Sequence, residues 1–146
     1  MSCVFCQIIA GRAPASIVYA DEHILAFLDI RPVRPGQLLI IPKRHIDHFS
    51  DLPDELSIRI LLLGQRVSRL MRRILSARRV GMIVHGFGVP HAHLVVLPLE
   101  HAPDITSSAN AYIEDGKVRF SWDRVPLAER AELDALAKRL EAGLGV

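Results

Sequence analysis

Two histidines, His91 and His93, stand two residues apart in the stretch Gly-Val-Pro-His-Ala-His-Leu-Val-Val-Leu-Pro. From Ala92 to Leu97 the composition is that of a buried strand. Because side chains alternate across a strand, we expect both rings on one face, about 6.6 Å apart at the usual rise. A neutral imidazole carries a donor and an acceptor that need partners, so it is poor core material. A lone histidine in a strand is more often structural, but two on one face after a Gly-rich turn favour a reactive site.

The chain has two cysteines, Cys3 and Cys6, in a Cys-x-x-Cys arrangement. In a reducing compartment this spacing is typical of half a zinc site or of a redox pair, rather than of a structural disulfide. A redox pair normally begins a helix that follows a strand, and no strand is expected before Cys3. Zinc would need two more ligands, and the histidines are the only plausible source. Two small, partly buried apolar residues are the alternative interpretation.

The composition sets bounds on the class of protein. The length of 146 residues predicts one domain over residues 1–146. Half of the residues are hydrophobic, yet no uninterrupted run has the length of a membrane helix. The start of the chain lacks the basic and apolar regions of a secretory signal, so we expect a cytoplasmic protein. A net charge of +2 does not indicate a nucleic-acid partner, and no aromatic residues interleave the arginines over residues 66–79 to stack on bases.

The elements that must position these side chains follow from hydrophobic periodicity. We predict strands over residues 17–20, 24–28, 37–41, 80–84 and 92–97. A short helix or turn is expected over 5–10, and a long helix capped by Ser50 or Asp51. The apolar positions of the long helix recur at intervals of three and four: Leu56, Ile60, Leu63, Val67, Met71 and Ile74. A last helix is expected to open at Pro126, after a polar, turn-rich segment over 104–123. Strands and helices do not alternate strictly, which favours an α+β fold with a largely antiparallel sheet.

Four motifs together closely resemble the histidine-triad (HIT) family of nucleotide-binding hydrolases and transferases. They are Cys-Val-Phe-Cys-Gln-Ile-Ile over 3–9, Ile-Leu-Ala-Phe-Leu-Asp-Ile-Arg-Pro over 24–32, Ile-Pro-Lys-Arg-His-Ile over 41–46, and Pro-His-Ala-His-Leu over 90–94. The match runs in order over the motif-bearing core, residues 3–98, and is loose over 99–146. The resemblance implies a HIT-like fold: a five-stranded antiparallel sheet with two main helices, paired into a homodimer whose sheets join.

The resemblance also implies a chemistry. An imidazole nitrogen attacks the α-phosphorus of a purine nucleotide conjugate (a phosphoramidate, anhydride or ester), and a nucleotidyl-histidine intermediate forms. His93 matches the nucleophile and Asp29 the carboxylate that accepts from the ribose hydroxyls. The backbone of Gly86 and Gly88 lies in the turn that approaches the phosphate. The residues that match the apolar slot for the base are Phe5, Ile8, Phe27 and Ile30, for which plain core packing is the alternative.

A branch of the family with an N-terminal Cys-x-x-Cys completes a zinc site with two histidines. The matching residues here are Cys3, Cys6, His45 and His91. Such a zinc would be structural, because all four positions are protein ligands and none is left for water.

The sequence departs from the family pattern beside the phosphate. Val95 occupies the position of the third motif histidine, and a valine can neither donate to phosphate nor position water. Loss of one such group typically costs two to three powers of ten in rate, about 3–4 kcal/mol. Phe87 and Gly88 replace the common Gln and Ser of the turn, and Gln37 stands where a histidine is frequent. The alternative function is therefore a zinc-stabilised nucleotide-binding module with weak or no catalysis.

Overall fold

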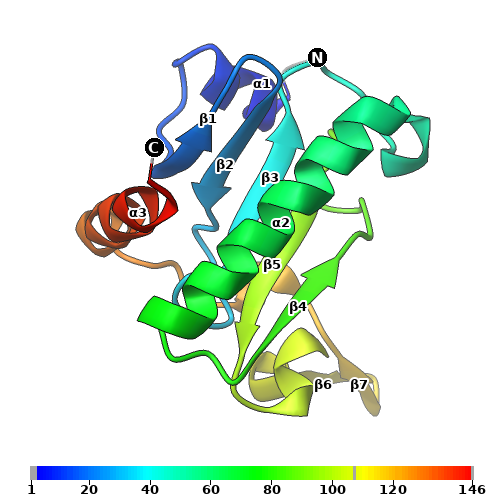
Figure 1. Ribbon diagram of the computed structural model, residues 1–146. Helices are drawn as coiled ribbons and strands as arrows, with labels where there is room; N and C mark the ends of the chain where they lie inside the picture. The colour runs from blue at the N-terminus through cyan, green and yellow to red at the C-terminus, as the bar shows by residue number, and fades with distance from the viewer. Residues whose placement is uncertain (1–2, 107, 146) are drawn as a thin grey trace.

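The computed structural model describes residues 3–106 and 108–145. Within these ranges, five strands pair antiparallel in the order β1-β2-β3-β5-β4, and two short strands form a separate hairpin (Figure 1). The strands of the sheet are β1 (Ile17–Ala20), β2 (Ile24–Leu28), β3 (Leu38–Pro42), β4 (Arg79–Ile83) and β5 (Leu94–Leu99). The hairpin consists of β6 (Tyr112–Glu114) and β7 (Lys117–Arg119), and the α-helices are α1 (Val4–Ile9), α2 (Asp54–Ile74) and α3 (Arg130–Leu144). The predicted α+β class and five-stranded antiparallel sheet are confirmed.

Both faces of the central strands are covered. Every residue of β2 and β3 is buried. Alternate side chains, such as Ala26 and Ile40, pack on the face under α2 and α3, while their neighbours Phe27 and Leu39 pack on the opposite face with α1. This explains why these strands are continuously apolar in sequence instead of alternating with polar residues. The odd-numbered positions therefore point to the side of the sheet that α1 covers.

The long helix α2 lies across the sheet (Figure 1). The predicted apolar stripe is confirmed, since Ile60, Leu63, Val67 and Met71 are buried against the strands. The predicted cap is wrong. The helix begins at Asp54, after Pro53, because residues 49–51 form a separate 3-10 turn in which the His48 ring accepts from the Ser50 N–H.

The last helix also begins later than predicted. Its first residue is Arg130 and not Pro126. The Ala128 N–H donates to the carbonyl oxygen of Ile30 at 2.9 Å, which holds the preceding residues against the loop after β2 instead of letting them coil. From Arg130 onward, Leu133, Ala137 and Leu140 bury the apolar face of α3.

The polar segment over 104–123 contains more regular structure than the sequence suggested. The strands β6 and β7 form a hairpin around Asp115 and Gly116, which both have positive φ, at 52° and 70°. An Asp-Gly pair is the usual sequence for such a two-residue turn. In the part of the chain that the structure describes, no helix has the length and apolarity needed to cross a membrane.

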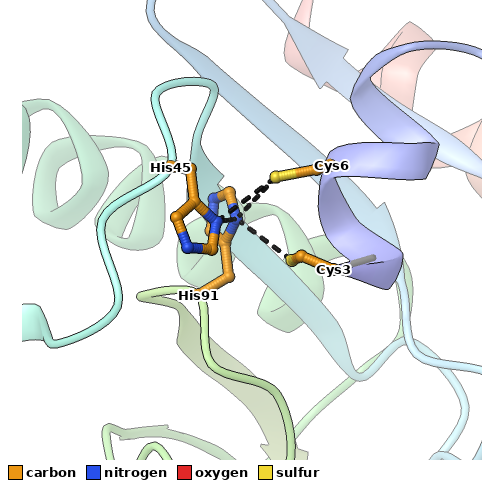
Figure 2. Close-up of side chains that lie close together, drawn as sticks. All are labelled: Cys3, Cys6, His45 and His91. Atoms are coloured by element: carbon orange, nitrogen blue, oxygen red, sulfur yellow. Dashed lines mark hydrogen bonds between the residues drawn. The ribbon is translucent and has the colours of Figure 1, made fainter. Parts of the chain in front are cut away.

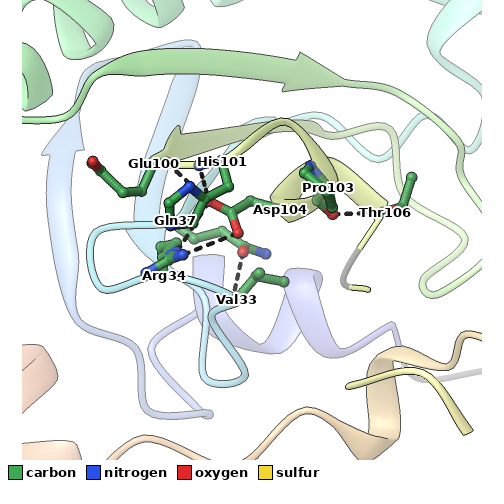
Figure 3. Close-up of polar contacts among 8 residues, drawn as sticks. All are labelled: Val33, Arg34, Gln37, Glu100, His101, Pro103, Asp104 and Thr106. Carbon is green, nitrogen blue, oxygen red and sulfur yellow. Dashed lines mark hydrogen bonds and ion pairs between the residues drawn. The ribbon is translucent and has the colours of Figure 1, made fainter. Parts of the chain in front are cut away.

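A buried carboxylate attaches the chain after β5 to the corner between β2 and β3 (Figure 3). Asp104 accepts two hydrogen bonds from the Arg34 guanidinium, both at 3.1 Å, and two from the backbone N–H groups of Glu100 and His101. The Arg34 hydrogen bond, the His101 N–H and the remaining donors outweigh burial and lower the pKa of Asp104 from 3.8 to about 2. In the same corner, Gln37 accepts from the Val33 N–H.

We expect Asp104→Asn to lower the free energy of unfolding by about 1–3 kcal/mol at pH 7, because buried donors lose a charged acceptor. The folded-state pKa is lowered, so the stabilisation is fully present above pH 3.8 and is lost as the pH falls through about 2. Urea unfolding of the wild type and of Asp104→Asn should therefore show a difference in the free energy of unfolding that becomes smaller below pH 4. Glu100→Gln, which removes an exposed neighbouring charge, is the control. Equal stability of Asp104→Asn and the wild type at pH 7 would contradict this role.

Candidate active site and metal centre

A cavity of about 470 Å³ opens on the side of the sheet that carries α1. Most of the residues with a predicted ligand-contacting role line it: Phe5, Ile8, Phe27, Asp29, Ile30, Gly88 and His93. Gly86 is not among the lining residues in the described part of the chain. Phe5 and Phe27 are also buried and meet edge to face at 5.4 Å, so they contribute to the core and to the cavity wall at once.

His93 lies in the cavity wall with its ring oriented by one short hydrogen bond. The side chain is 7% exposed, and its Nδ1 lies 2.7 Å from the carbonyl oxygen of His91. Because a carbonyl can only accept, Nδ1 carries the proton and Nε2 carries the lone pair. Burial lowers the pKa of His93, partly opposed by this hydrogen bond, so the ring is neutral near pH 7. A neutral imidazole with a free Nε2 is a competent nucleophile.

The predicted strand over 92–97 begins later than expected, at Leu94 of β5, so His93 lies just before the strand, as His91 does. The backbone before β5 bonds to the loop after β3 and not to a neighbouring strand: the Ala92 N–H donates to the carbonyl oxygen of Ile46 at 2.7 Å. Both rings still lie near the same side chain, since each makes a T-shaped contact with the Phe5 ring, with centroids 5.8 and 5.4 Å away.

Four side chains from three separate segments converge beside the cavity (Figure 2). Cys3 and Cys6 come from the start of α1, His45 from the loop after β3, and His91 from the segment before β5. One ligand atom from each lies within 4.8 Å of all the others, and the group could hold a metal ion. These are the four residues that the family resemblance implies as metal ligands.

The buried member of this group, His91, is oriented for coordination. Its Nε2 donates to the carbonyl oxygen of Pro42 at 2.8 Å, so Nδ1 carries the lone pair and faces the sulfur atoms. Burial, more than any neighbouring charge, lowers the pKa of His91 and keeps it neutral. Burial also raises the pKa of Cys6, and the adjacent Cys3 thiol raises it further. A cation bound between the two sulfur atoms would favour their thiolate forms and so oppose this rise in the pKa of Cys6.

Asp29 follows β2 and lines the cavity with its carboxylate held by two donors. Its Oδ1 accepts from the Arg31 N–H and its Oδ2 from the Gln37 amide, each at 2.9 Å. Gln37, which stands where a histidine is frequent in the family, therefore orients this carboxylate. Each carboxylate oxygen has a second lone pair.

The C-terminal part of the chain contributes to the cavity in a way that the sequence did not indicate. Ile105 and Trp122 line it. Arg31 donates through Nη1 to the carbonyl oxygens of Asp123 and Val125, at 2.9 and 2.7 Å, and so attaches this segment to the loop after β2. Trp122 is the single tryptophan of the chain, and its isolation in a polar segment was the available signal.

Two further residues of the cavity bear on chemistry. Val95, at the third motif position, is buried, and its backbone is paired with Ile83 of β4. His85 follows β4 and also lines the cavity. His85 was missed in sequence because the pairing of β4 with β5, which places it near His93, is not visible in a local motif.

Comparison with known proteins gives consistent results. The family model described as HIT domain matches residues 10–102. An uncharacterized HIT-like protein of Mycobacterium tuberculosis is 34% identical over 143 residues, covering 94% of this chain and 99% of that protein. Adenosine 5'-monophosphoramidase hnt1 of Schizosaccharomyces pombe is 36% identical over 100 residues, covering 67% of this chain and 74% of that protein.

A solved structure extends the comparison to the N-terminal cysteines, which precede the region matched by the family model. The Zn-bound histidine triad family protein from Mycobacterium smegmatis superposes with a TM-score of 0.74 at 30% identity. The match covers 99% of this chain and 94% of that one. The HIT fold expected from the motifs is thereby confirmed.

We expect the His93 ring to be neutral and protonated on Nδ1 at pH 7, because that nitrogen donates to a buried carbonyl and burial opposes the charged form. Long-range ¹H–¹⁵N spectra of histidine-labelled protein, with His93→Gln to assign the signal, measure both properties. An imidazolium at pH 7, or a neutral ring with the proton on Nε2, would contradict the orientation described here.

Proposed function

The chain belongs to the histidine-triad (HIT) family, and from this premise we propose that it is a nucleotide hydrolase or nucleotidyl transferase. The proposed substrate is a purine nucleotide conjugate with a phosphoramidate, anhydride or ester leaving group. The relative from Schizosaccharomyces pombe, named as an adenosine 5'-monophosphoramidase, supports the phosphoramidate as the first compound to test.

The observation that carries this proposal is the orientation of His93. With Nδ1 donating to the His91 carbonyl, the lone pair of Nε2 is available to attack the α-phosphorus. The N–P bond forms as the bond from phosphorus to the leaving group breaks with its electron pair. The ring becomes a phosphorylated imidazolium, and the same 2.7 Å hydrogen bond stabilises the new positive charge. Water or another acceptor then attacks phosphorus, and the electron pair of the N–P bond returns to Nε2.

The rest of the cavity supports the binding of a nucleoside. Asp29 presents an oriented carboxylate suited to accept from ribose hydroxyls. We propose that Phe5, Ile8, Phe27 and Ile30 form the slot for the base, and that the backbone near Gly86 and Gly88 approaches the phosphate. The cavity has a volume typical of sites for small molecules.

We further propose that the four-residue group binds zinc. Tetrahedral zinc keeps its sulfur and nitrogen ligands about 3.5 Å apart and two nitrogens about 3.3 Å apart, given its bond lengths of about 2.3 and 2.05 Å. The sulfur–nitrogen distances are 3.5 Å from Cys3 to His91, 3.3 Å from Cys6 to His45 and 3.6 Å from Cys6 to His91, and the two Nδ1 atoms are 3.2 Å apart. The donor atoms thus fit the ion, which would hold α1 against the loops after β3 and before β5.

A nucleotide-binding module without efficient catalysis is the second candidate, and Val95 is the observation that favours it. The buried valine in the cavity wall donates nothing to phosphate. Turnover that depends on His93 distinguishes the enzyme from the module.

The homodimer implied by the family resemblance also stays a proposal. Strand β4 is an edge of the sheet, so one side of its backbone lies outside the ladder with β5. Joining of two sheets at an edge would satisfy those main-chain groups.

We expect His93→Ala to reduce the release of AMP from adenosine 5'-phosphoramidate at least about a thousandfold, because it removes the nitrogen that forms the proposed intermediate. The affinity for AMP should change only a few-fold, since Asp29 and the apolar slot remain. A coupled assay measures turnover and calorimetry measures binding. His23→Ala, an exposed histidine outside the cavity, is the control. AMP binding without turnover by the wild type would favour the module, and absence of both would contradict the proposed function.

We expect one zinc ion per chain in protein purified without chelators, measured by mass spectrometry of the metal. Cys3→Ser/Cys6→Ser should lose it, because neutral hydroxyls replace two thiolate ligands. At free zinc a thousandfold above its Kd, bound metal contributes about 4 kcal/mol of stability, so chelation should lower the Tm of the wild type but not of this variant. His48→Ala, which removes an exposed histidine nearby in sequence, should retain the metal. Wild type that takes up no zinc after incubation with it would contradict the proposal.

A further inference from the structure

In the proposed reaction, no side chain has yet been assigned to donate a hydrogen bond to the phosphate. Negative charge accumulates on the non-bridging oxygens of the phosphate in the transition state, and hydrogen-bond donors aimed at them speed the reaction. The third motif position carries Val95, which cannot donate. Among the described residues that line the cavity, His85 is the one imidazole besides His93.

His85 and His93 lie two residues beyond the last pair of the ladder between β4 and β5. In the antiparallel pairing of β4 with β5, Ile83 lies opposite Val95. Continuing the same ladder by two residues on each chain brings position 85 opposite position 93, and side chains two residues apart share a face. The ring centroids of His85 and His93 are 6.3 Å apart, with the planes at 81°. The two imidazoles thus lie close together in the cavity wall, just beyond the paired parts of β4 and β5.

The His85 ring is also oriented as a donor. Its Nδ1 accepts a long hydrogen bond from the Phe87 N–H at 3.4 Å, so the neutral ring carries its proton on Nε2. The ring stacks on the side chain of Phe87, with centroids 6.4 Å apart and planes at 18°. Phe87 itself is 95% exposed.

We propose that His85 supplies the third imidazole of this site, from the segment after β4 instead of from β5, and donates its Nε2–H to a non-bridging phosphate oxygen. This inference rests on the proposed nucleotide function, and it concerns binding and stabilisation of charge, not transfer of the proton. A phosphate next to His93 Nε2 lies between the two rings. His85 therefore takes the role of the histidine that β5 lacks at position 95, and Val95 does not need to be polar.

The test compares His85→Ala with His101→Ala, an exposed histidine that does not line the cavity. The variant His85→Ala should weaken AMP binding about tenfold and leave adenosine binding unchanged, since only AMP carries a phosphate. It should lower kcat for adenosine 5'-phosphoramidate about a hundredfold. Because the side chain is exposed, the Tm should change little, which separates this loss from misfolding.

Rescue by the family residue makes the test sharper. In the double variant His85→Ala/Val95→His, a donor returns from the β5 side, and at least a tenfold recovery of kcat is expected, while Val95→His alone should gain much less. Such non-additivity is what two groups serving one phosphate produce. Equal AMP-to-adenosine affinity ratios and kcat in wild type and His85→Ala would overturn the role of His85 and leave the proposed function standing. If the wild type binds AMP but shows no turnover, the ratio of AMP affinity to adenosine affinity still tests the role of His85. If the wild type binds no AMP, both the role of His85 and the proposed function are overturned.

Discussion

A buried imidazole must have both of its ring nitrogens satisfied, and the way His91 meets this requirement organises the whole site. Its Nε2 donates to Pro42 at the end of β3, and its Nδ1 faces the sulfur atoms from α1. Its carbonyl oxygen accepts from the ring of His93. One fully buried residue thus connects the third strand, the N-terminal helix and the proposed nucleophile. A displacement of the His91 backbone would turn the His93 ring.

This connection would give a zinc ion at the four-residue group a role at a distance from the proposed reaction. An ion held by four protein ligands would have no open position for water or substrate, so it would act only by fixing the positions of those ligands. It would hold the loop before β5, where the backbone bonds to the Ile46 carbonyl instead of to a neighbouring strand. The ion and the hydrogen bonds of His91 would then act on the same short segment, on which the direction of Nε2 of His93 depends.

The positions of Gln37 and Val95 in the sheet explain how the chain accommodates these two departures from the family pattern. Gln37 replaces a frequent histidine, and its amide bridges the Val33 N–H and the carboxylate of Asp29. Val95 replaces a third histidine, and it packs in the apolar cluster of Phe5, Phe27 and Leu39. Val95 thus extends the apolar wall on the α1 side of the sheet, and Gln37 orients the carboxylate at its edge. The hydrogen bond to phosphate that Val95 cannot donate is the one that we propose for His85.

The sequence by itself determined the five strands of the main sheet, the stripe of α2 and the set of residues proposed to bind metal and nucleotide, because these depend on local periodicity and on short motifs. It did not determine where α2 and α3 begin, since Asp54 and Arg130 follow segments held by contacts such as that of Ala128 with Ile30. Nor could it place His85, Ile105 and Trp122 at the cavity. Their positions depend on the register of β4 against β5 and on the attachment of the C-terminal segment by Arg31 and Arg34. Pairings between residues far apart in the chain leave no local pattern, so only the tertiary structure decides them.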